Sequence, residues 1–242
     1  MRIWIFGKRT AKEILRDPMS LGFGLGFPLI LLGLMTLIQR NIPVSLFEID
    51  HLTPGITAFG LSFLCLFTAT LVSKDRGGSL MARLRATPMR SVDFFFGYLL
   101  PLIPPSLAQM TVTYGAAILL GLTPTVRILP AVLVQLPMAV FYLSLGILCG
   151  CLLNERQVGG VCGALLTNLG AWLSGAWFDL KLIGGALEQA AYLLPFAPAV
   201  DAGRQALAGT AVSVRNLLVC GIWTAAAIVA AALACSRLTK AR

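Results

Sequence analysis

Long stretches of apolar residues alternate with short polar segments along this chain of 242 residues. Each stretch is free of Asp, Glu, Lys, Arg and His, and each has about the length of a membrane-spanning helix, roughly 20 residues. The stretches are Leu21–Leu37, Pro54–Val72, Phe94–Leu122, Ile128–Leu153, Val158–Phe178 and Leu217–Cys235. The pattern predicts an all-α polytopic membrane protein with six transmembrane helices, built as a single domain over residues 1–242.

Residues 1–17 form a polar and apolar segment that precedes the first predicted span. At helical spacing its apolar residues fall on one face and its basic residues largely elsewhere, which is typical of a helix lying in the plane of the membrane. The apolar face consists of Trp4, Gly7, Ala11, Ile14 and Leu15. Asp17 precedes Pro18, and a residue before proline is pushed out of helical geometry, so we expect this interface helix to end there.

A second unusual segment covers residues 178–214, between the last two predicted spans. Its part Gly184–Pro195 is largely apolar, with Glu188 as its one charged residue. This part is too short to cross a bilayer and too apolar for a solvated loop, so we expect a re-entrant pair of short helices. Asp201 and Arg204 are three residues apart on the expected helix, which predicts a local ion pair.

The formal net charge of +9 is distributed unevenly among the loops. With the N-terminus assigned to the cytoplasm, 14 of the 19 basic residues fall on the inside: Arg2, Lys8, Arg9, Lys12, Arg16, Lys74, Arg76, Arg83, Arg85, Arg90, Arg156, Arg237, Lys240 and Arg242. The positive-inside rule therefore predicts that both termini are cytoplasmic. The positive charge is explained by orientation and by attraction to lipid headgroups, so it does not indicate binding of nucleic acid.

The candidate chemistry of the chain is sparse. Without an ionisable residue in the predicted spans, the chain lacks the relay that proton- or sodium-driven pumps keep in the membrane. Gly77-Gly78-Ser79 lacks the lysine of a phosphate-binding loop, so we expect that the chain does not split ATP by itself. All six cysteines lie in apolar spans without metal-ligand spacing and are interpreted as buried hydrophobes. We expect no bound cofactor.

Several motifs resemble those of ABC-2 type transporter permeases. Arg16-Asp17-Pro18 followed by Phe27-Pro28 resembles the start of such a permease. Residues 75–89 read DRGGSLMARLRATPM, which is similar to the loop D-x-x-x-G-L-M-D-R-F-R-x-L-P-M of the daunorubicin-resistance type, with departures at Ser79 and Ala82. The segments Leu173–Phe178 and Leu194–Gly209 resemble the last third of the family, so the resemblance covers nearly the whole chain.

The resemblance implies a mechanism for the chain. Such permeases pair as dimers, here expected as a homodimer in a bacterial inner membrane, and dock ABC ATPase subunits that bind ATP and Mg. The loop 74–92 would provide the helix that seats on the ATPase. The residues expected to contribute to this coupling are Asp75, Arg76, Ser79, Leu80, Arg83, Leu84, Arg85, Thr87 and Pro88, together with Arg9, Arg16 and Asp17 of the interface helix.

The cargo and its path follow less directly from the sequence. Apolar spans with few polar side chains suit an amphipathic or lipid-like molecule, and the resemblance implies a drug or antibiotic. Candidates for lining the pathway are Gln109, Thr113, Asn168 and Glu188, although hydrogen bonding between helices is the simpler interpretation of the amides. Export of a lipid-linked saccharide remains an alternative, as does a membrane-embedded lipid-modifying enzyme, for which the inside offers only Asp75, Asp93 and Glu155.

Overall fold

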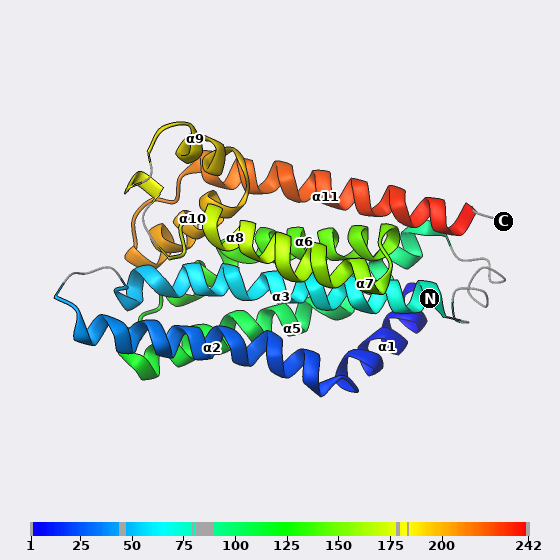
Figure 1. Cartoon of the computed structure of the whole chain (residues 1–242), viewed down its shortest axis with the longest axis horizontal. Helices are drawn as coiled ribbons and strands as arrows, with labels where there is room; N and C mark the ends of the chain where they lie inside the picture. The colour runs from blue at the N-terminus through cyan, green and yellow to red at the C-terminus, as the bar shows by residue number, and fades with distance from the viewer. Residues whose placement is uncertain are drawn as a thin grey trace.

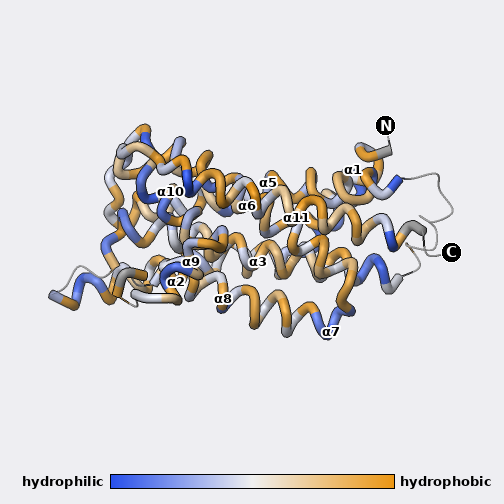
Figure 2. The backbone as a smooth tube through the Cα atoms, turned by 90° about the horizontal axis from the view of Figure 1, so that it is seen from above, coloured by the Kyte–Doolittle hydropathy of each residue, from blue (hydrophilic) through white to orange (hydrophobic). Residues whose placement is uncertain are grey.

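The structure is a computed structural model that describes residues 2–43, 47–78, 80, 90–177, 180–182 and 184–240. Every regular element in these ranges is a helix (Figure 1). The long helices lie side by side, and the two chain ends lie at the same end of the bundle (Figure 1). The most hydrophilic residues collect near the two ends, and the middle is apolar (Figure 2). The all-α prediction is therefore confirmed.

Five helices are long and apolar enough to cross a membrane. They are α2 (Pro18–Asn41), α3 (Ile49–Gly77), α5 (Ser91–Leu120), α6 (Ile128–Leu152) and α11 (Val214–Lys240). Helices α2, α3 and α11 each contain a whole predicted apolar stretch, whereas α5 and α6 end two residues and one residue before the ends of theirs. Pro101, Pro104 and Pro105 lie inside α5 without ending it. The chain is thus a multi-pass membrane protein.

The remaining predicted span, Val158–Phe178, is divided among three consecutive helical segments. These are α7 (Glu155–Val158), the π-helix η1 (Gly159–Leu166) and α8 (Thr167–Leu173). The backbone stays helical across both junctions, with φ/ψ of −57°/−45° at Gly159 and −64°/−46° at Thr167. A regular α-helix of the 19 residues from Glu155 to Leu173 would be about 28 Å long, which sets an upper bound because part of this run is π-helical. Each segment alone is shorter than a membrane span. Whether this fifth predicted stretch crosses the membrane, and with it the total of six spans, therefore stays a prediction.

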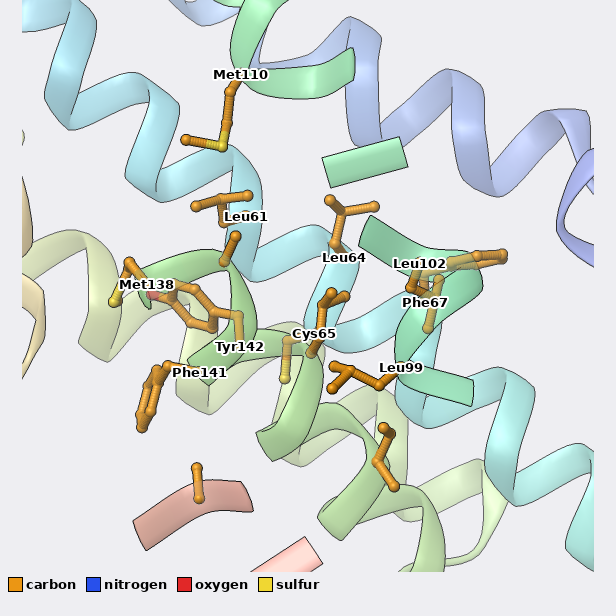
Figure 3. Packing of buried hydrophobic residues seen from close by; sticks show 14 of the residues in the cluster. Leu61, Leu64, Cys65, Phe67, Leu99, Leu102, Met110, Met138, Phe141 and Tyr142 are labelled. Atoms are coloured by element: carbon orange, nitrogen blue, oxygen red, sulfur yellow. The ribbon is translucent and has the colours of Figure 1, made fainter. Parts of the chain in front are cut away.

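Helix α3 forms the centre of the bundle and packs against α2, α5 and α6. Along an apolar stretch of 18 residues within α3, 83% of the residues are buried. Side chains of α3, α5 and α6 gather between the helices (Figure 3), among them Leu64, Cys65, Leu99 and Tyr142. Because a Cβ on Gly146 would lie 2.6 Å from the Cys65 carbonyl oxygen, this glycine allows α6 to approach the α3 backbone closely.

Helix α1 (Arg2–Leu15) precedes the bundle at the end that holds the termini (Figure 1). Its buried stripe is Phe6, Thr10 and Ile14, and it packs against α5. Trp4 and Leu15 are 78% and 75% exposed, so the helix has a second apolar side that the chain itself does not cover. The apolar face predicted from the sequence was therefore incomplete, because it left out the buried Phe6 and Thr10. The position of this helix in the plane of the membrane stays a prediction.

Two short helices, α9 (Gly185–Leu193) and α10 (Phe196–Ala208), follow in the segment where a helical pair was expected. In α9 only Ala191 is buried, whereas α10 packs against α3, α6 and α11. The predicted ion pair is confirmed, since Arg204 Nη1 lies 3.3 Å from Asp201 Oδ1. Tyr192 of α9 also donates a hydrogen bond to Asp201 (2.6 Å). These contacts hold the two helices together; their depth in the membrane stays a prediction.

Candidate functional site

An ionic network centred on the buried Asp75 joins α1, α3 and α5 at the end of the bundle that holds the termini. Arg9 of α1 donates two hydrogen bonds to Asp75 of α3, from Nη1 to Oδ2 (2.5 Å) and from Nη2 to Oδ1 (2.8 Å). Tyr98 of α5 donates a third to Asp75 Oδ2 (2.9 Å). Asp75 is only 5% exposed, so these donors replace the water that its carboxylate loses. The fork of the arginine matches the two carboxylate oxygens and fixes the relative position of α1 and α3.

Aromatic packing on α1 and α5 positions the arginine. The Phe6 ring lies edge-on to Tyr98, with centroids 4.9 Å apart and planes at 85°. Phe6 also overlaps the space that a side chain at Gly97 would need, so the glycine lets α1 lie directly on α5. One turn separates Phe6 from Thr10 on the same stripe, and Arg9 next to it reaches across to α3.

Glu13 extends the network along α1. Its Oε2 atom lies 2.6 Å from Arg9 Nη2, an i,i+4 pair. Burial raises the pKa of Glu13, and the neighbouring Asp75 carboxylate raises it further, whereas Arg9 and Lys74 lower it. The hydrogen bonds to Asp75 raise the pKa of Arg9 against the opposing effect of its own burial. Arg9 is thus firmly charged and serves two carboxylates.

The residue after Asp75 connects α3 to a different helix. Arg76 donates to the backbone carbonyl of Cys151 from Nη1 and to that of Leu153 from Nη2, both at 2.7 Å. These carbonyls belong to the end of α6, where a helix leaves acceptors without intrahelical donors and where its dipole favours a cation. Asp75 and Arg76 therefore bind the last turn of α3 to α1, α5 and α6 at once.

We call the contacts of Arg9, Glu13, Asp75, Arg76 and Tyr98 the junction, because they join the last turn of α3 to α1, α5 and α6. Residues 74–78 lead directly into the segment predicted to seat on an ATPase, of which Ser79, Arg83, Leu84, Arg85, Thr87 and Pro88 lie outside the described residues. Leu80 is described and is half-buried. A displacement of α3 at this end must move α1 and α6 with it or break charged hydrogen bonds, which are the strong ones.

Two other predicted residues of the interface helix lie beside the junction. Asp17 caps α2, since its carboxylate accepts from the backbone N–H (3.1 Å) and the hydroxyl (2.7 Å) of Ser20. These bonds lower the pKa of Asp17. Arg16 is exposed. The structure therefore brings Arg9, Asp75 and Arg76 together, and it gives Asp17 the separate task of starting α2.

The pathway candidates on α5 are buried among helices. Gln109 and Thr113 are each 1% exposed, and Gln109 Nε2 donates to Thr113 Oγ1 (3.3 Å) and to the Thr57 carbonyl (3.5 Å). Nearby, Gln135 Nε2 donates to the Pro54 carbonyl (2.9 Å), which links α6 to α3. In this conformation these amides serve helix packing; a role in transport stays a prediction.

The other two pathway candidates lie on the surface. Asn168 is exposed on α8 and donates to the Ala164 carbonyl (2.7 Å). Glu188 is half-buried on α9. The structure thus buries one pair of the pathway candidates and leaves Asn168 exposed and Glu188 half-buried, and their common role in a pathway stays a prediction.

Two of the three acids named for a lipid-modifying enzyme are engaged in other contacts. Asp75 is paired with Arg9, and Asp93 accepts a hydrogen bond from the backbone N–H of Arg90 (2.9 Å) in the first turn of α5. Glu155 is exposed at the start of α7. Within the described ranges, no three His, Cys, Asp or Glu residues are grouped so that they could hold a metal ion.

Sequence reasoning missed two members of the junction. Tyr98 lies in a continuous apolar stretch, where a tyrosine carries no pattern that points to a partner 23 residues away. Glu13 could have been found from the sequence, because an acid four residues after an arginine on a helix is placed to form an ion pair with it.

Comparison with known proteins gives one finding. The sequence profile of the family described as "ABC-2 type transporter" matches residues 1–208. No curated protein matches the chain.

Proposed function

The chain belongs to the ABC-2 type transporter family, and from this premise we propose that it is the membrane-spanning half of an ATP-driven exporter in a bacterial cytoplasmic membrane. The family supplies the membrane permease component of an ABC transporter, and it implies an ABC ATPase as partner. In the proposal, ATP and Mg bind to that partner, and the permease converts its closure into movement of the spans.

The observation that carries the coupling proposal is the bidentate pair of Arg9 and Asp75. It stands at the end of α3, directly before the segment 79–88. We assign this segment the role of the coupling helix that seats on the ATPase. Force applied there would reach α1 through Asp75 and α6 through Arg76, so three elements would respond as one.

The sidedness of the proposal rests on charge. The chain ends and the junction lie at one end of the bundle (Figure 1), and this end carries the excess of basic residues counted in the sequence. The positive-inside rule makes it the cytoplasmic end. The opposite end, with α9 and α10, would then face outward.

A second copy of the chain is the proposed partner within the membrane. Asn168 is exposed in the predicted fifth span, and an amide that faces lipid is unfavourable unless protein or water covers it. Trp172 and Leu165, on the same helical run, are 61% and 54% exposed. A homodimer would cover this face and place Asn168 near a shared pathway.

For cargo we propose an amphipathic drug or antibiotic, in keeping with the resemblance of residues 75–89 to the daunorubicin-resistance type. The mainly apolar helices, with polar groups at Gln109 and Thr113, suit a molecule that leaves the membrane core rather than the water. A lipid-linked saccharide is the second candidate cargo, because a lipid tail would meet the same surfaces.

The test is transport by the reconstituted complex. Inside-out vesicles that contain the chain and its partner ABC ATPase are supplied with fluorescent daunorubicin. We expect ATP-dependent accumulation, and none with an ATPase whose catalytic glutamate is replaced by glutamine. Accumulation without ATP, or ATP-dependent flux in the opposite direction, would contradict the proposal. ATP-dependent export of a lipid-linked saccharide in place of the drug would keep the exporter and change the cargo.

A further inference from the structure

An open groove with a volume of about 1010 Å³ runs between α1 and α3. The α1 side contributes one face of the helix, and α3 contributes the stretch that leads to the junction. Among the lining residues are Trp4, Lys8 and Lys12 of α1 and Phe67, Leu71 and Lys74 of α3. The volume lies at the upper end of the range of small-molecule sites, about 300–1,000 Å³. It is large enough for a headgroup with part of a hydrocarbon chain.

The charges of the groove do not balance. Its two acids are already engaged, Glu13 by Arg9 and Asp17 by Ser20. Arg9 in turn is held by Asp75. The remaining cations are exposed and form no ion pair with any residue that the structure describes: Lys8, Lys12, Arg16 and Lys74. The groove therefore attracts an anion.

The groove also has an apolar part. Trp4 and Ile5 are 78% and 64% exposed on the α1 side of the groove, and Phe67 and Leu71 line it on the α3 side. In a membrane protein, an exposed tryptophan near a helix end is typical of the boundary between headgroups and hydrocarbon. Cations and hydrocarbon surface thus meet within one groove, and a membrane lipid has the same two parts.

We propose that this groove binds one anionic phospholipid, with its phosphate among Lys8, Lys12, Arg16 and Lys74 and an acyl chain along Trp4. Lysine binds phosphate as a point charge, and several lysines around one groove suit a phosphate group better than a single carboxylate. The lipid would fill the space between α1 and α3 and brace the interface helix next to the Arg9 and Asp75 pair. The inference depends on insertion in a membrane and not on an ATPase or on export.

Native mass spectrometry of the full chain tests the site, with phosphatidylglycerol and phosphatidylcholine of identical acyl chains as probes. The test variant carries Lys12→Gln and Lys74→Gln, and the matched control carries Arg156→Gln and Arg237→Gln. The control loses the same net charge at the same end of the bundle, from exposed positions outside the groove. Both variants keep the junction intact.

We expect phosphatidylglycerol adducts on the wild type and the control, and a dissociation constant raised about 30-fold in the Lys12 and Lys74 variant. Equal losses in both variants would show general attraction and would overturn the site. Equal binding of phosphatidylcholine would also overturn it. Inorganic phosphate in excess should fail to displace the lipid, because it lacks the acyl chain; displacement by phosphate alone would show a site for free phosphate instead.

A second measurement covers the case in which the double variant does not fold. Trp4 is kept as the one tryptophan, and the other three are replaced by phenylalanine. Phosphatidylglycerol brominated on its acyl chains should quench Trp4 more strongly than brominated phosphatidylcholine at equal mole fraction. Equal quenching by the two lipids would contradict a bound anionic lipid.

Discussion

The replacements Arg9→Gln and Asp75→Asn probe the junction, and we expect their effects on stability to be unequal. The two side chains form the same ion pair but differ in surroundings. Asp75 is 5% exposed, whereas the Arg9 side chain is 35% exposed and also contacts Glu13. The buried partner suffers more when its counter-charge is removed, because the exposed one can turn to water.

The magnitudes follow from what each replacement leaves behind. Arg9→Gln leaves a buried carboxylate with Tyr98 as its remaining side-chain donor. An uncompensated buried charge costs about 3–5 kcal/mol, and the water that reaches Arg9 reduces this to about 2–3 kcal/mol. Asp75→Asn keeps an oxygen that accepts from Tyr98, and Arg9 keeps Glu13. We therefore expect a loss of about 1 kcal/mol for this replacement.

The measurement is the free energy of unfolding in mixed micelles, titrated with dodecyl sulfate. Arg16→Gln is the matched control, since Arg16 is an exposed arginine near the end of the same helix. The double variant Arg9→Gln with Asp75→Asn should recover part of the loss, because it leaves no unpaired charge. The reasoning is refuted if Arg9→Gln is no worse than Arg16→Gln, or if Asp75→Asn costs more than Arg9→Gln.

Three further predictions concern packing, pH and proximity. Gly146→Ala should lower the free energy of unfolding by about 1–3 kcal/mol, because the added Cβ would meet the α3 backbone. The control Gly115→Ala should not lower it, because no atom lies within 4 Å of the added Cβ. Equal effects of the two replacements in the same titration would argue against close packing of α6 on α3. The raised pKa of Glu13 means that the folded protein holds this proton to higher pH than the unfolded chain does, so the free energy of unfolding should fall as the pH rises from the pKa of Glu13 in the unfolded chain to its pKa in the folded protein. Glu13→Gln should remove this pH dependence and be the more stable form at neutral pH. A wild-type free energy of unfolding that rises over this range would contradict the assignment. Cys151 and Cys235 lie with sulfur atoms 3.5 Å apart, so a chain that keeps only these cysteines should form an intramolecular disulfide on oxidation, seen by mass spectrometry after proteolysis; its absence would place α6 and α11 differently.

The bundle was largely predictable because a bilayer imposes one strong rule on sequence. A charged side chain within the hydrocarbon costs free energy, so an uncharged apolar stretch such as Pro54–Val72 predicts a helix even when the neighbouring helices are not known. The division of the fifth stretch was not predictable. At the end of its π-helical segment the side-chain hydroxyl of Thr167 donates to the Cys162 carbonyl, five residues back, and apolar composition does not encode that spacing.

The members of the junction were partly predictable, but their geometry was not. Asp75 and Arg76 were named because they begin the motif of residues 75–89, and Arg9 because it lies in the predicted interface helix. The pairing of Arg9 with Asp75 spans 66 residues, and it depends on how α1 lies over α5. That placement is decided by Phe6 against Tyr98 and by the absence of a side chain at Gly97, which are contacts between elements rather than patterns within one.

Binding of the ATPase partner to the segment after α3 tests the central claim most directly. The full chain, its Leu84→Asp variant and a Leu182→Asp control are each purified from membranes by an affinity tag, and the ABC ATPase that comes with them is quantified. Leu182 is 74% exposed and precedes the first residue of α9 by three positions. Helix α9 lies at the end of the bundle away from the two termini (Figure 1), so the replacement adds the same charge close to the end where no ATPase is expected. We predict that Leu84→Asp reduces bound ATPase and ATP-driven export together, by about tenfold or more, because it places a charge in an apolar contact. Normal binding and export by Leu84→Asp would contradict the account.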